Sequence, residues 1–163
     1  MIKRELYMNR IRPFIGGELI KVMTGIRRSG KSVMLELIKE ELAEAGVAPS
    51  QMISINFEDM RYSHLQTATA LHDEIIKRAE GIEGKAYLFF DEIQEVEGWE
   101  KCVNSLRVAL DCDIYITGSN AKLLSGELAT YIGGRYVEFV IYPFSFAEFL
   151  CLLYTSPSPR DLS

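Results

Sequence analysis

The segment GIRRSGKS, residues 25–32, constrains the fold of this 163-residue chain more than any other stretch. It matches the pattern G-x-x-x-x-G-K-[ST], in which glycines let the backbone turn so that successive N–H groups face a bound phosphate. The apolar stretch LIKVMT, residues 19–24, precedes it, and a helical pattern over residues 30–45 follows it. This order places the turn at a helix N-terminus, whose partial positive charge favours an anion. The alternative is a basic turn before an ordinary helix start.

Short apolar runs alternate with helical patterns along the whole chain, which is typical of an α/β fold with a parallel sheet. We expect strands at residues 19–24, 52–57, 86–91, 113–118 and 136–142. We expect helices at residues 2–15, 30–45 and 65–79, and another around Val103, Leu106 and Leu110. The third strand, AYLFFD, is apolar up to its last residue, so it belongs in the centre of a sheet that is covered on both faces.

Two acids close this central strand. Asp91, at its carboxyl end, could hold Mg²⁺ beside Ser32, usually through water. Glu92 is placed to orient and deprotonate an attacking water without being consumed as a metal ligand. Lys31 would reach the β and γ phosphates of a nucleotide as a point charge. The alternative is that both acids are surface residues that cap the next turn.

Polar residues also follow the fourth strand and precede the fifth. In YITGSN, Ser119 or Asn120 could hydrogen-bond a γ phosphate or the attacking water, since ligands bind at the carboxyl ends of such strands. Asn120 could equally cap the helix that follows. In GGRY, Arg135 could stabilise charge on a transferring phosphoryl group, in cis or from a neighbouring subunit. It could equally be a solvated surface arginine.

Four blocks in this order resemble ATPases of the AAA+ superfamily: GIRRSGKS, YLFFDEIQEVEGWE, YITGSNAKLLSGELATYIGGRY and YPFSFAEFL. The resemblance covers residues 5–150 and is strongest to a bacterial and archaeal branch whose N-terminal AAA domain precedes a C-terminal domain of poorly known function. It implies an α/β P-loop NTPase fold of the ASCE/AAA+ type, a three-layer sandwich with parallel strand order 5-1-4-3-2. It also implies Mg²⁺-dependent hydrolysis of ATP, rather than GTP, coupled to a conformational switch.

The resemblance carries roles to individual residues. Lys31 and Ser32 fall in the Walker A motif, and Asp91 and Glu92 in Walker B, with Ser32 and Asp91 as the metal ligands. Asn120 or Ser119 would be sensor 1, and Arg135 the arginine finger. The residues implied to bind nucleotide are Gly25, Ile26, Arg27, Arg28, Ser29, Gly30, Lys31, Ser32, Val33, Asp91 and Ser119, with Ile11, Pro13 and Phe14 lining an adenine pocket.

Three segments are expected along the chain: a helical lead-in at residues 1–18, the P-loop ATPase domain at 19–150 and a tail at 151–163. The tail, CLLYTSPSPRDLS, resembles translated adapter sequence, and a short natural disordered C-terminus is the alternative. The helical lid of AAA+ proteins and the further domain of this branch have no counterpart here. We therefore expect the chain to be a truncated fragment of a longer protein.

Composition and charge limit the partners. A net charge of −5 gives no overall attraction to nucleic acid or to an anionic membrane, although basic residues crowd the first thirty positions. They could form a local basic surface or be ordinary solvated charge. The three cysteines lack C-x-x-C spacing, and no apolar stretch reaches about 20 residues, so we expect a cytoplasmic protein that does not use a membrane.

Three functions remain open. The first is the ATPase, assembled as a homo-oligomer if Arg135 acts in trans. The second is a non-catalytic module that senses nucleotide and recruits a partner. The third is a DNA-associated ATPase, in which Arg27 and Arg28 could contact nucleic acid. In each case an unknown protein or DNA partner would be reached through the missing C-terminal domain.

Overall fold

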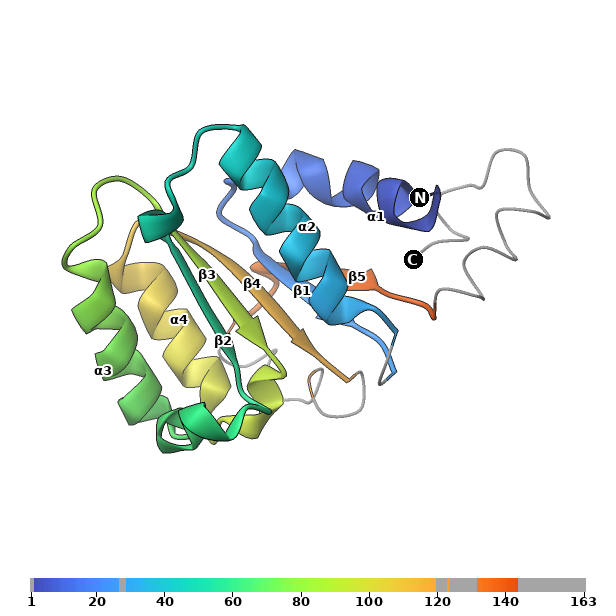
Figure 1. Cartoon of the computed structure of the whole chain (residues 1–163). Coiled ribbons are helices and arrows are strands. Elements are labelled where there is room, and N and C mark those ends of the chain that lie inside the picture. The colour runs from blue at the N-terminus through green and yellow to red at the C-terminus, as the bar shows by residue number, and fades with distance from the viewer. Residues whose placement is uncertain (1, 27–28, 120–122, 124–131, 144–163) are drawn as a thin grey trace.

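The computed structural model describes residues 2–26, 29–119, 123 and 132–143, and its centre is a five-stranded sheet (Figure 1). The strands are β1 (Ile20–Thr24), β2 (Met52–Asn56), β3 (Ala86–Asp91), β4 (Cys112–Gly118) and β5 (Tyr136–Val140). Their order across the sheet is β2-β3-β4-β1-β5, and every neighbouring pair is parallel. This order confirms the predicted 5-1-4-3-2.

Helices cover both faces of the sheet (Figure 1). α1 (Ile2–Ile11) and α2 (Lys31–Glu44) pack on one face, and α3 (Ala68–Ala79) and α4 (Trp99–Ala109) pack on the other. Side chains of β3 alternate between the two cores: Leu88 and Phe90 pack towards α3 and α4, and Phe89 packs towards α1 and α2. Full burial of each such side chain contributes about 1.5–3 kcal/mol. The predicted three-layer sandwich is therefore confirmed.

Two helix boundaries differ from the prediction. The helix expected at residues 65–79 begins at Ala68, because the hydroxyl of Thr67 accepts a hydrogen bond from the Ala70 N–H at 3.3 Å. The helix expected at 2–15 ends at Ile11, and Pro13 lies in a short 3₁₀ turn after it. The 3₁₀ segments are Arg12–Phe14, Pro49–Gln51, Met60–Leu65 and Ile93–Glu95.

Lys21 of β1 and Asp113 of β4 form a buried ion pair. This pair also binds the turn that precedes β1. Both side chains are fully buried. Lys21 Nζ donates to Asp113 Oδ1 and, at 2.9 Å, to the Gly17 carbonyl. Asp113 Oδ2 accepts from the Gly16 N–H at 2.8 Å and from the Tyr115 hydroxyl at 2.6 Å. Lys21 is thus neither part of a basic surface nor a solvated charge, and both expectations are wrong for it.

Burial is the main cause that lowers the pKa of Lys21, and the charge of Asp113 opposes this shift. We expect Lys21→Ala to lower the free energy of unfolding by about 3–5 kcal/mol, since Asp113 would stay buried without its counter-charge. Urea denaturation measures this loss. The control is Lys85→Ala, which breaks an exposed pair with Asp111 and should cost about 1 kcal/mol or less. Equal losses of unfolding free energy in the two variants would contradict the greater contribution expected of the buried ion pair.

Candidate active site

The loop of residues 25–32 runs from the end of β1 to the start of α2, as predicted. Gly30 has φ 100°, a left-handed conformation that favours glycine. A Cβ at Gly25 would lie 2.4 Å from the carbonyl oxygen of Ile141, so only glycine fits there. Both glycines of the pattern are therefore required by the path of the backbone, which brings the loop to the N-terminus of a 14-residue helix.

The side chain of Lys31 folds back onto the backbone at the start of the loop. Its side chain is 5% exposed, and Nζ donates to the carbonyl oxygens of Gly25 at 2.8 Å and Ile26 at 3.3 Å. Nζ also lies 3.6 Å from Glu92 Oε1. The amine of Lys31 thereby lies between the carbonyl groups of the loop and the carboxylate of Glu92.

Ser32 and Asp91 meet across the gap between α2 and β3. The Ser32 hydroxyl donates to Asp91 Oδ2 at 2.6 Å. Both residues line a cavity of about 260 Å³, whose other residues are Val33, Leu35, Glu36, Lys39, Ser54 and Asn56. A hydroxyl and a carboxylate are oxygen donors of the kind that Mg²⁺ prefers, so this pair fits the expected metal.

Thr117 of β4 joins the two acids, and the sequence reasoning missed it. Its hydroxyl donates to Asp91 Oδ1 at 2.5 Å and accepts from the Glu92 N–H at 2.9 Å. The available signal was a hydroxyl side chain near the carboxyl end of the strand, two residues before Ser119. Contact with Asp91 depends on the pairing of β3 with β4, which the linear pattern does not give.

Glu92 has an unusual backbone and a second side-chain partner that was also missed. Its φ of 58° and ψ of 51° are left-handed, and no other non-glycine residue in the described ranges has a positive φ. Gln94 Nε2 donates to Glu92 Oε2 at 2.6 Å. Both oxygens of the carboxylate are thus directed, one towards Gln94 and the other towards Lys31.

The remaining predicted residues lie in different places. Ser119 follows β4 at the same edge as the loop, and its carbonyl accepts from Leu123 N at 2.8 Å. Ile26, within the loop, and Val33, directly after it, are both exposed. Arg27, Arg28 and Asn120 fall outside the described residues, as does the expected tail at 151–163.

Arg135 lies at the opposite edge of the sheet. Its carbonyl accepts from the N–H of Ile20, the first residue of β1, at 2.9 Å, and its side chain is exposed. The five residues of β1 separate it from the loop, which at about 3.3 Å per residue is ~16 Å. The structure therefore does not bring Arg135 together with the other predicted site residues of its own chain.

The residues expected to line an adenine pocket have mixed surroundings. Ile11 is fully buried in the core under α1 and α2. Phe14 is half-buried and packs edge-to-face on Phe139, with ring centroids 5.7 Å apart, while Pro13 is exposed. In this structure Ile11 is a core residue.

The all-parallel sheet, its strand order and the glycine-rich loop at the start of α2 define an α/β P-loop NTPase fold. A model of the AAA domain family matches residues 17–150. The chain belongs to this family, which makes it a nucleotide-binding domain of the ATPase type.

Two curated relatives share much of the sequence. The chain is 48% identical over 150 residues to an uncharacterized protein of Haemophilus influenzae, covering 92% of this chain and 38% of that protein. It is 41% identical over 132 residues to an uncharacterized protein of Methanocaldococcus jannaschii, covering 80% and 28%. The chain thus spans less than two fifths of the length of these relatives.

Solved structures share the fold at low identity. A DNA polymerase III gamma subunit-related protein of Thermotoga maritima aligns with a TM-score of 0.61 at 11% identity, over 90% of this chain and 49% of its own. PCH-2 of C. elegans gives 0.55 at 16%, over 91% and 42%. Drosophila ORC, bound to AT-rich DNA and Cdc6, gives 0.54 at 10%, over 98% and 65%.

In the part of the chain that the structure describes, no helix is both long and apolar enough to cross a membrane.

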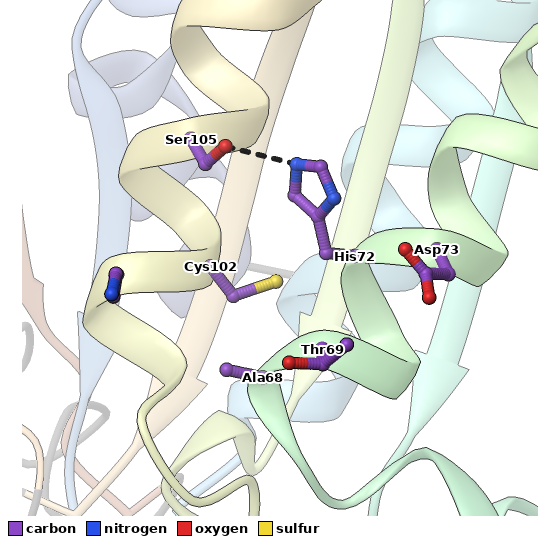
Figure 2. Close-up of a pocket in the computed structure, with 7 residues that line it drawn as sticks. Ala68, Thr69, His72, Asp73, Cys102 and Ser105 are labelled. Atoms are coloured by element: carbon purple, nitrogen blue, oxygen red, sulfur yellow. Dashed lines mark hydrogen bonds between the residues drawn. The ribbon is translucent and has the colours of Figure 1, made fainter.

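A second hollow, of about 300 Å³, lies between α3 and α4 (Figure 2). His72 of α3 and Ser105 of α4 are hydrogen-bonded across it, with Nε2 and Oγ 2.9 Å apart. Cys102 is 3% exposed at its base, and burial raises the pKa of its thiol to about 12. This hollow contains none of the residues predicted to bind nucleotide.

The two described cysteines should resist alkylation. Burial raises the pKa of Cys102 to about 12 and is the main cause that raises that of Cys112 to about 11, so both stay neutral thiols at pH 8. We expect iodoacetamide at pH 8 to label neither thiol appreciably in the folded chain and both in urea, as site-resolved mass spectrometry would show. Rapid labelling of Cys102 in the folded chain would contradict this.

Proposed function

We propose that the chain binds Mg²⁺-ATP at the loop of residues 25–32, hydrolyses it, and drives a conformational switch in a longer protein. The observation that carries the proposal is the hydrogen-bonded series from Ser32 through Asp91 and Thr117 to Glu92, with Lys31 3.6 Å from its last member. This series supports the proposal because an amine, a serine hydroxyl and two carboxylates lie together at the N-terminus of α2. The AAA family match supports ATP as the nucleotide.

Each group has a defined task in the proposed reaction. The backbone N–H groups of the loop and the amine of Lys31 hold the β and γ phosphates. Ser32 and Asp91 would hold the Mg²⁺ ion, which when bound neutralises charge that develops on the phosphate oxygens. Glu92 accepts a proton from the water that attacks the γ phosphorus, as the bond from that phosphorus to the bridging oxygen breaks.

Two substitutions separate binding from chemistry. Lys31→Ala removes the cation at the phosphates and should abolish detectable ATP binding. Glu92→Gln keeps the shape of the side chain and should bind ATP normally, but lower turnover by about 10²–10⁴-fold because the base is lost. Phosphate release and the fluorescence of a labelled ATP analogue measure the two effects.

Each variant has a control in which the same substitution is made at an exposed residue of the same type. Lys77→Ala on α3 and Glu95→Gln, three residues after Glu92, should match the wild type, since both side chains are exposed. Unchanged turnover in Glu92→Gln would remove Glu92 as the base. Tight ATP binding by the wild type with no phosphate release would instead identify a nucleotide-sensing module.

We also infer that Arg135 serves the phosphates of a neighbouring copy. The length of β1 separates Arg135 from the loop of its own chain, and its exposed side chain is available to a second subunit. An arginine supplied in trans needs an assembly in which the amino edge of one sheet faces the carboxyl edge of another. The proposed site is therefore shared between two copies.

Mixing two inactive variants tests this arrangement. Arg135→Ala should lower turnover by about 10³-fold. Adding equimolar Glu92→Gln chains should restore phosphate release, because they supply the arginine that the Arg135→Ala copies lack. Arg78→Ala, which removes a surface arginine paired with Glu74, is the matched control and should leave turnover unchanged. No recovery on mixing would exclude action in trans, and full activity of Arg135→Ala alone would make it a solvated surface residue.

A further inference from the structure

We propose that Gln94 is a positioning residue that fixes the carboxylate of Glu92, and that Gly118 at the end of β4 leaves the space that the Gln94 amide occupies. The inference rests on the proposed role of Glu92 as the base. Gln94 lies in the 3₁₀ turn Ile93–Glu95, two residues after Glu92, and its Nε2 donates to Glu92 Oε2 at 2.6 Å. A carboxylate oxygen must accept, so the chemistry of the contact assigns the amide nitrogen to it.

The backbone of Glu92 makes this support necessary. A left-handed conformation is unfavourable for a residue with a Cβ and persists where neighbouring groups over-determine it. The Glu92 N–H donates to Thr117 Oγ1 at 2.9 Å, which holds the main chain. Gln94 holds the side chain at one oxygen, and the other oxygen, Oε1, faces Lys31 Nζ at 3.6 Å. Oε1 is thus the oxygen that is free of the amide and directed towards the proposed phosphate site.

Glycine at the end of β4 leaves room for the Gln94 amide. A Cβ at Gly118 would lie 2.3 Å from Gln94 Oε1, and 3.0 Å from Leu123 Cδ1. Gln94 Oε1 is buried and has no hydrogen-bond partner among the described residues. The hydrogen bond from the amide nitrogen to Glu92 therefore holds the amide in this position, and the missing side chain at residue 118 leaves space for it. Within the described ranges, the amide oxygen makes no hydrogen bond that would contribute.

This packing couples two parts of the site. Ser119, which is expected to contact the γ phosphate or the attacking water, directly follows Gly118. A displacement of the strand end at Gly118 towards Gln94 would move the amide and, through its hydrogen bond, the Glu92 carboxylate. Misplacing a catalytic group by about 1 Å can cost on the order of 10²-fold in rate.

A double-substitution experiment tests both contacts. We expect Gln94→Ala to lower kcat by about tenfold or more while KM and Mg²⁺-ATP affinity stay unchanged, because the base loses its orientation but the phosphate contacts remain. Gly118→Ala should have a similar effect by displacing the amide, since Gly118 does not have a positive φ and accepts alanine in its backbone. The double variant should be no slower than Gln94→Ala, because Gln94 Oε1, the atom nearest to the added Cβ, is gone.

Two further variants keep the result interpretable. Gln94→Met retains the side-chain volume without a donor and should reproduce the loss in kcat even if Gln94→Ala unfolds. Gln51→Ala removes a glutamine whose amide binds the Lys85 carbonyl at the other edge of the sheet, and should match the wild type.

The outcomes separate this inference from the proposed function. No phosphate release by the wild type would mean that the proposed function has failed. Normal release by the wild type with unchanged or raised kcat in Gln94→Ala and Gln94→Met would overturn only the role of Gln94. Fully additive losses in the double variant would overturn the coupling through Gly118.

Discussion

Parallel pairing of β4 with both β1 and β3 is the constraint on which the site depends. The register sets Thr24 beside Gly118 on one side of β4 and Phe90 beside Ile116 on the other, so the three strands end at one edge. Groups that lie far apart in the sequence then come within hydrogen-bonding distance. Ser32 contacts Asp91, 59 residues later, and Thr117 contacts Asp91 from 26 residues away. No single segment could assemble these groups by itself.

The same strand organises both ends of the sheet. At its amino end Asp113 binds Lys21 and the turn that leads into β1, and at its carboxyl end Thr117 binds the acids of β3. The apolar residues between these two points pack into cores on both faces. The buried ion pair lies at the start of β1, and the loop begins at the end of β1. Both are therefore positioned by contacts with the same neighbouring strand, β4.

The sequence was sufficient where a local pattern determines the structure. Strand positions followed from apolar runs, and the loop from the spacing of Gly25, Gly30 and Lys31, while the strand order came from the family resemblance. The predictions mostly failed where a contact with a residue distant in sequence determines the environment of a side chain. Lys21 reads as a surface charge until Asp113, 92 residues away, is placed beside it. The start of α3 is an exception, because it depends on a local contact, the Thr67 cap. The contacts of Thr117 and Gln94 depend on strand register and on the unusual backbone of Glu92.

The geometry divides the proposed chemistry between the two edges of the sheet. The groups proposed to bind phosphate, to bind the metal and to act as the general base lie at the carboxyl edge, whereas Arg135 lies at the amino edge, one strand length away. A strand cannot shorten, so no local rearrangement of one copy would close this distance while β1 stays paired on both sides. If Arg135 takes part in the proposed reaction, the reaction must therefore depend on assembly. Hydrolysis would then be coupled to the presence of a neighbouring subunit, which gives a domain of this size a physical means of linking ATP turnover to the state of a larger complex.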